Sequence, residues 1–169
     1  NQVEGYKTYC ELVVRWAGLF TNDNRINCVI TLHPSANYSN VRDVLGKNVN
    51  LVKTRTHELL AACDVFVVDC SSTSKWALAM GKLVIDYDIY KFNFLYHSKA
   101  EGILHVKEEW EVEQVLDNYF SGKYESIYKQ IQRKENAEKW GVIDGKATER
   151  LSNFFHELKN DDSKPQRVI

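Results

Sequence analysis

The chain has 169 residues, of which 44% are hydrophobic and 27% charged, and its formal net charge is −1. This composition excludes a disordered chain and fits one globular domain with a substantial core. Because there is no basic excess, we expect no nucleic-acid partner, and the longest apolar runs are too short to cross a bilayer. The four cysteines lie far apart without a CxxC pair, which favours a reducing compartment over disulfides or zinc.

Strand and helix patterns alternate from the first residues onward. Apolar residues recur every three or four positions in the first segment, and Asn22-Asp23-Asn24 ends that pattern. A strand that follows is stopped by His33-Pro34, since proline cannot continue a strand ladder. The elements predicted in this half are a helix over 6–20, a strand over 26–32, a helix over 38–45, a strand over 49–52 and a helix over 56–62.

The second half begins with one strand–turn–helix–strand unit. An apolar run enters Asp69-Cys70-Ser71-Ser72-Thr73, a helical segment follows, and Gly81-Lys82 opens another apolar run. The predicted elements are a strand over 65–69, a helix over 73–80, strands over 83–87 and 102–106, one or two helices over 108–139 with a break near residues 121–122, and a helix over 147–159.

The alternation of strands and helices predicts an α/β fold, a doubly wound, Rossmann-like parallel sheet covered on both faces. Residues 65–68 and 83–85 are continuously apolar, as expected for central strands. We expect a single domain over residues 1–159 and a flexible tail over 160–169. Because the chain opens with a helix where such domains normally open with a strand, we expect it to be part of a longer, two-domain protein.

Ligands of open parallel sheets bind at the carboxyl ends of the strands, and several polar residues fall there. They are His33, Asp69, Ser71, Ser72, Thr73, Asp86 and Asp88. Backbone amides at a helix start, with hydroxyls beside them, suit a phosphate. Serine and threonine also cap helices routinely, and His33 fits an ordinary turn histidine, so both interpretations stay open. Lys82, Lys53 and Arg55 are candidate cations near strand ends, and no metal-ligand spacing occurs among the histidines.

Three short motifs resemble one known family in their order and spacing. Thr31-Leu32-His33-Pro34, Asp69-Cys70-Ser71-Ser72 and Tyr87-Asp88 are similar to motifs of the CDP-glycerol glycerophosphotransferases of teichoic-acid and capsule-polysaccharide biosynthesis. The segment 144–150 is similar to the closing segment of that family. These enzymes have the GT-B glycosyltransferase fold, so the resemblance implies its C-terminal, donor-binding half. Cys70 replaces the family's usual tyrosine, and Leu83 stands where proline is common.

The resemblance implies a transferase that moves a glycerophosphate or a sugar from a nucleotide donor to a polymer or lipid-linked acceptor. It implies that His33, Ser71, Ser72 and Thr73 bind the donor phosphates, with His33 also catalytic. Asp69, Asp88 and Lys82 become candidate donor contacts. A cytidine nucleotide is the preferred donor, as substrate, and no cofactor is expected.

The resemblance further implies that the acceptor binds an N-terminal domain outside this chain, so the chain alone is expected to be inactive. A cytoplasmic location, with peripheral attachment at the inner membrane face in the full-length protein, follows from a lipid-linked acceptor. Two alternatives stay open. One is a non-catalytic Rossmann-like binding module. The other is an enzyme like the UDP-N-acetylglucosamine 2-epimerases, although their Ser-Gly-Gly turn and paired glutamates are missing here.

Overall fold

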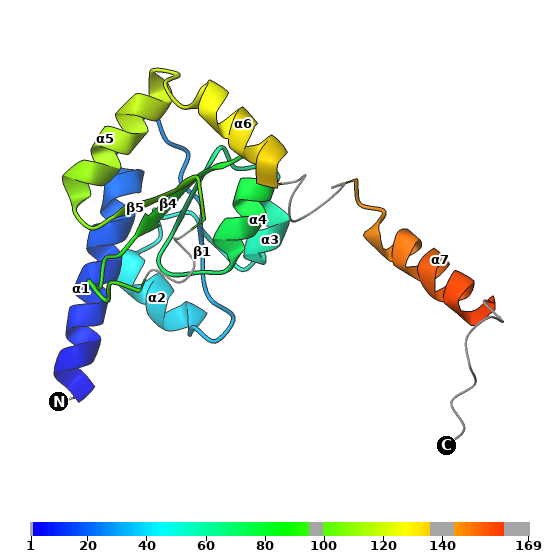
Figure 1. Ribbon diagram of the computed structural model, residues 1–169. Helices are drawn as coiled ribbons and strands as arrows, with labels where there is room; N and C mark the ends of the chain where they lie inside the picture. Colours follow the sequence, from blue (N-terminus) through cyan, green and yellow to red (C-terminus); the bar gives the residue numbers. More distant parts are fainter. Residues whose placement is uncertain (1, 95–99, 136–143, 161–169) are drawn as a thin grey trace. The chain divides into compact units, whose positions relative to one another are not determined.

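The computed structural model describes residues 2–94, 100–135 and 144–160, and the chain divides into two compact units, residues 1–132 and 133–169. Figure 1 shows the elements. In chain order they are α1 (Gln2–Thr21), β1 (Ile30–Thr31), α2 (Tyr38–Leu45), β2 (Leu51–Val52), α3 (Thr56–Leu59), β3 (Val65–Val68), α4 (Thr73–Ala79), β4 (Leu83–Tyr87), β5 (Ile103–Val106), α5 (Glu109–Phe120), α6 (Glu125–Glu135) and α7 (Ala147–Asn160).

The fold is α/β with parallel strands, as the sequence predicts, but the described strands form two sheets in place of one continuous sheet. One sheet has the order β1-β2 and the other the order β3-β4-β5, and all pairings are parallel. The strand predicted over residues 26–32 is reduced to Ile30–Thr31, and that over 49–52 to Leu51–Val52. Residues 26–29 have no strand partner among the described residues, so they do not enter a ladder.

The central strand β4 is buried along its whole length, because it lies between two other strands and under helices. Its neighbours in the core include Leu78 of α4 and Val112 of α5. In Figure 1, α1 and α5 lie on one side of β4 and β5, and α3 and α4 on the other. The expectation that β3 is equally buried is wrong: each of its residues is half-buried, because β3 is at the edge of its sheet.

A second, smaller core holds the first sheet to the first two helices. Ala17 of α1, Ile30 of β1, Val41 of α2 and Leu51 of β2 pack together. Helix α2 has the predicted bounds because both ends are capped. The Asn37 side chain accepts a hydrogen bond from the Asn40 N–H, and a glycine with φ of 76° follows the last turn.

Several predicted boundaries differ from the observed ones. The helix predicted over residues 56–62 is reduced to the single turn of α3, which begins after Arg55 and has no side-chain cap. The break at residues 121–122 is confirmed, since α5 ends at Phe120 and α6 begins at Glu125. The later part of the predicted segment 108–139 lies outside the described residues, as does the tail beyond residue 160.

The second unit contains α7. The carboxylate of Asp144 accepts hydrogen bonds from the backbone N–H of Lys146 at 3.0 Å and from Arg150 Nη1 at 2.9 Å. These bonds fix the turn that precedes the helix, because a carboxylate near a helix start satisfies N–H groups that have no partner inside the helix.

Candidate functional site

The carboxyl ends of strands from both sheets meet at one cavity. Leu32, which follows β1, Asp69, which follows β3, and Ile89 and Tyr90, which follow β4, all line a cavity of about 120 Å³. Its other walls come from α1, α2 and Ile30 of β1, and most of the side chains that form them are apolar. The segments that carry His33 and the Ser71–Thr73 turn therefore leave their strands beside the same cavity.

The turn between β3 and α4 is held by a long-range hydrogen bond and a strained residue. Cys70 has φ of 47°, a left-handed conformation that is uncommon for a residue other than glycine. Its N–H donates to Oδ1 of Asp86 at 3.0 Å. Since Asp86 is buried in β4, this hydrogen bond lets β4 fix the direction in which the turn leaves β3.

Ser71 is used inside the turn. Its hydroxyl oxygen accepts a hydrogen bond from the Thr73 N–H at 3.2 Å and lies 3.1 Å from the Thr73 hydroxyl. Its carbonyl oxygen accepts from the buried Ser74 hydroxyl at 2.6 Å. The Ser71 side chain thus serves as a helix cap, the ordinary role that the sequence left open.

Ser72 differs from its neighbour. It occupies the position before the first residue of α4, is exposed and makes no capping hydrogen bond. Helix α4 has only seven residues, so its dipole contributes little. Among the hydroxyls predicted to bind phosphate, the Ser72 hydroxyl is the one that no other described residue engages.

Three carboxylates lie behind this turn. Asp86 and Asp88 are buried, and the Asp88 oxygens accept hydrogen bonds from the backbone N–H groups of Phe92 at 2.8 Å and Asn93 at 2.7 Å. The carboxylate of Asp69 accepts no hydrogen bond from the described residues. Burial, together with the nearby charges of Asp88 and Asp86, raises the pKa of Asp69 to about 6.

His105 of β5 completes this group. Its Nδ1 lies 3.4 Å from Oδ2 of Asp86, while its Nε2 is buried without a partner among the described residues. The sequence places Asp86 at this edge, as the structure does, but gives no indication of His105. The signal for Asp86 was present, because a carboxylate inside the apolar run 83–87 must be buried and needs hydrogen-bond donors.

His33 is exposed, and its ring orientation is set locally. The Ser35 backbone N–H donates to Nδ1 at 3.2 Å, and the Ser35 hydroxyl lies 2.7 Å from the same nitrogen. Because Nδ1 accepts the backbone N–H, the proton of the neutral ring is on Nε2. The imidazole therefore presents an N–H donor at the carboxyl end of β1.

Lys82 is not brought together with these residues. It precedes β4, so it lies at the amino edge of the sheet, opposite Asp69 and Asp88. Its Nζ donates to the Ala61 carbonyl oxygen at 3.1 Å. Lys53, by contrast, directly follows β2, and the register of β1 and β2 places it at the same edge as His33.

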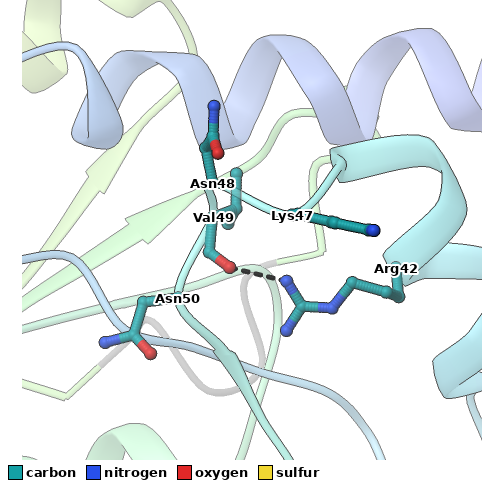
Figure 2. A pocket seen from close by; sticks show the side chains of 5 residues that line it. All are labelled: Arg42, Lys47, Asn48, Val49 and Asn50. Atoms are coloured by element: carbon teal, nitrogen blue, oxygen red, sulfur yellow. Dashed lines mark hydrogen bonds between the residues drawn. The ribbon is translucent and has the colours of Figure 1, made fainter.

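A larger, open depression lies away from this edge. Figure 2 shows its lining residues, Arg42 and the loop residues 47–50 that precede β2. Arg42 donates to the carbonyl oxygens of Val49 at 2.7 Å and Leu51 at 2.5 Å, and to the Tyr38 hydroxyl at 2.9 Å. Because its donors are already used to hold the loop, we assign the depression no ligand.

Among the described residues, the remaining reactive groups form no further centre. All four cysteines are free thiols, and burial raises the pKa of Cys28, Cys63 and Cys70. In the part of the chain that the structure describes, no three or more metal-ligating side chains gather, and no helix has the length and apolar character needed to span a membrane.

Comparisons of the chain with models of protein families, with curated proteins and with solved structures found no match.

Proposed function

We propose that this chain is the donor-binding domain of a transferase that moves a glycerophosphate or a sugar from a cytidine nucleotide to a polymer or lipid-linked acceptor. The observation that carries this proposal is the cavity shared by Leu32 and Asp69. It supports a common edge for two of the motifs that resemble the CDP-glycerol glycerophosphotransferases, the one containing His33 and the one containing Ser71 and Ser72.

In this proposal, two exposed donors bind the donor phosphates. The Nε2–H of His33 donates to one phosphate oxygen, and the Ser72 hydroxyl, which caps no helix, donates to another. Ser71 and Thr73 contribute indirectly, because their mutual hydrogen bonds fix the turn that presents Ser72. The N–H donor of His33 stabilises negative charge on a departing nucleotide.

Charge limits where the phosphates lie. Asp69, Asp86 and Asp88 would repel a diphosphate at short range, so the phosphates are assigned to the outer side of the turn, toward Lys53. The ammonium of Lys53 lies 4.9 Å from the centre of the Tyr38 ring, which positions it beside β2. We therefore replace Lys82 by Lys53 as the proposed cation.

Calorimetric titration of the chain with CDP, CDP-glycerol, CMP-sialic acid and UDP-sugars tests this proposal. We expect saturable binding of a cytidine nucleotide, weakened by about tenfold in Ser72→Ala and His33→Ala, the loss expected for one charge-assisted hydrogen bond. Ser152→Ala and His156→Ala on α7 are matched controls, since both residues are exposed. Absence of saturable binding by every nucleotide would refute the proposal.

A second function is favoured by one observation. Internal hydrogen bonds already engage the side chains of Ser71, Thr73 and Asp88. This is the arrangement expected of a non-catalytic binding module with a vestigial site. The same titrations separate the two functions, because such a module would bind none of the nucleotides.

A further inference from the structure

The cavity at the carboxyl edge combines aromatic rings with one carboxylate. Tyr9 and Trp16 of α1 and Tyr90 after β4 line it together with Asp69, and aliphatic side chains form the rest of its wall. No lysine or arginine is among its lining residues. These walls differ from those of a phosphate site, which needs donors and positive charge.

The local charge is negative. Asp69 has no hydrogen-bond donor among the described residues, and the neighbouring carboxylates Asp88 and Asp86 act on it. The hydroxyl of Tyr90 lies close enough to Asp69 and Tyr9 for both to raise its pKa, with burial the largest cause. A cation entering the cavity would relieve this repulsion, whereas an anion would add to it. The cavity therefore offers aromatic walls and one negative charge.

We propose that this cavity binds a small quaternary ammonium group, the cationic part of choline, with the cation held by Asp69 and the aromatic rings of Tyr9, Trp16 and Tyr90. Aromatic side chains attract cations through the negative faces of their rings, and quaternary ammonium groups are bound in this way because they form no hydrogen bonds.

The size of the cavity agrees with this class of ligand. A protein cavity of roughly 150 Å³ holds a benzene ring. A cavity of about 120 Å³ therefore accommodates a trimethylammonium group, which is smaller than that ring, but excludes a nucleotide. The site is thus independent of the proposed donor phosphates on the outer side of the turn.

Calorimetry with choline and with 3,3-dimethylbutan-1-ol tests the proposal, because the second compound has the same shape and hydroxyl group without the charge. We expect choline to bind at pH 7.5 and the neutral compound to bind at least about tenfold more weakly, as loss of an ion pair and of cation–π contacts predicts. Equal affinity for the two would overturn the proposal.

Variants assign the binding to this cavity. Asp69→Asn keeps the shape of the side chain and should weaken choline binding by about tenfold or more. Asp64→Asn, which changes an exposed carboxylate before β3, should leave it unchanged. Unaltered binding by Asp69→Asn, with circular dichroism showing a folded chain, would contradict the assignment.

Two further measurements identify the source of the ligand and separate this site from the nucleotide site. Binding of free choline indicates a soluble ligand, whereas flotation with phosphatidylcholine but not phosphatidylglycerol vesicles indicates a lipid headgroup. Failure of both overturns the proposal. Ser72→Ala should retain choline binding, so that loss of nucleotide binding alone would leave this inference standing.

Discussion

The carboxylate of Asp86 in β4 accepts a hydrogen bond from the backbone N–H of Cys70, 16 positions earlier in the chain, at 3.0 Å. This bond joins two neighbouring strands at the point where the functional turn begins. It also accounts for a buried charge inside an otherwise apolar strand, because a buried carboxylate needs donors.

We expect Asp86→Ala to lower the free energy of unfolding by about 1–3 kcal/mol, the cost of leaving a buried donor without its acceptor. Asp86→Asn keeps an oxygen at the same place and should cost less. Urea unfolding followed by circular dichroism measures both changes. Equal losses in the two variants would show that the charge, and not the hydrogen bond, is what matters.

The stability of variants at position 70 should depend on how well the new residue adopts a left-handed backbone conformation. Its φ of 47° is unfavourable for β-branched residues, so Cys70→Val should destabilise the chain by about 1–3 kcal/mol. Cys70→Gly should be close to neutral, because relief of strain offsets the added chain entropy of the unfolded state. Thermal denaturation of both variants checks this, and a valine variant as stable as the glycine variant would argue against strain.

Substitution of Ser71 should lower stability, whereas substitution of Ser72 should weaken nucleotide binding with little effect on stability. Ser71→Ala removes a helix cap and should cost about 1 kcal/mol of unfolding free energy. Ser72→Ala removes an exposed hydroxyl without a capping role and should change stability by less than about 0.5 kcal/mol. Denaturation and nucleotide titration of the same two preparations test this. A Ser72 variant that is less stable than the Ser71 variant would reverse the assignment.

Asp69 should make stability depend on pH. Its pKa is raised from 3.8 to about 6 in the folded chain, so between these values the folded state binds more protons than the unfolded state. Stability therefore falls as pH rises from about 4 to 6, and the penalty is complete above that range.

Asp69→Asn should remove this penalty. We expect the variant to be more stable than the unchanged chain by about 1 kcal/mol at pH 7.5, once solvent screening is allowed for, and equally stable below pH 4. Urea unfolding at both pH values measures the difference, with Asp64→Asn as control. An advantage of the variant that is the same at both pH values would contradict the assignment.

Gly102, before β5, should not tolerate a side chain. Its φ is 93°, and an added Cβ would lie 2.9 Å from Cγ2 of Ile131 and 3.2 Å from Cδ2 of Leu78. Gly102→Ala should therefore cost about 1–3 kcal/mol. Gly122, with φ of 78° and no atom within 4 Å of an added Cβ, is the matched control. Alanine there would be destabilised only by the positive φ and not by a steric clash. Equal losses at the two positions would exclude the packing contribution.

The order of helices and strands was determined by the sequence alone. Periodicity and capping residues act over three or four positions, so the bounds of α2 and β4 follow from their own residues and immediate neighbours. The placement of Asp69, Ser71, Ser72 and Asp88 after strands was likewise readable, because parallel strands bring their carboxyl ends to one edge.

Only the tertiary structure decided what those side chains do. The Ser71 side chain caps the following helix, and Lys82 lies at the opposite edge of the sheet. Asp69 lines a cavity with α1 and α2 and has no hydrogen-bond donor among the described residues. Such roles depend on partners many residues away, as Asp86 is from Cys70. A local pattern cannot specify them, because the same residue in the same motif is a cap, a ligand or a buried charge according to what packs against it.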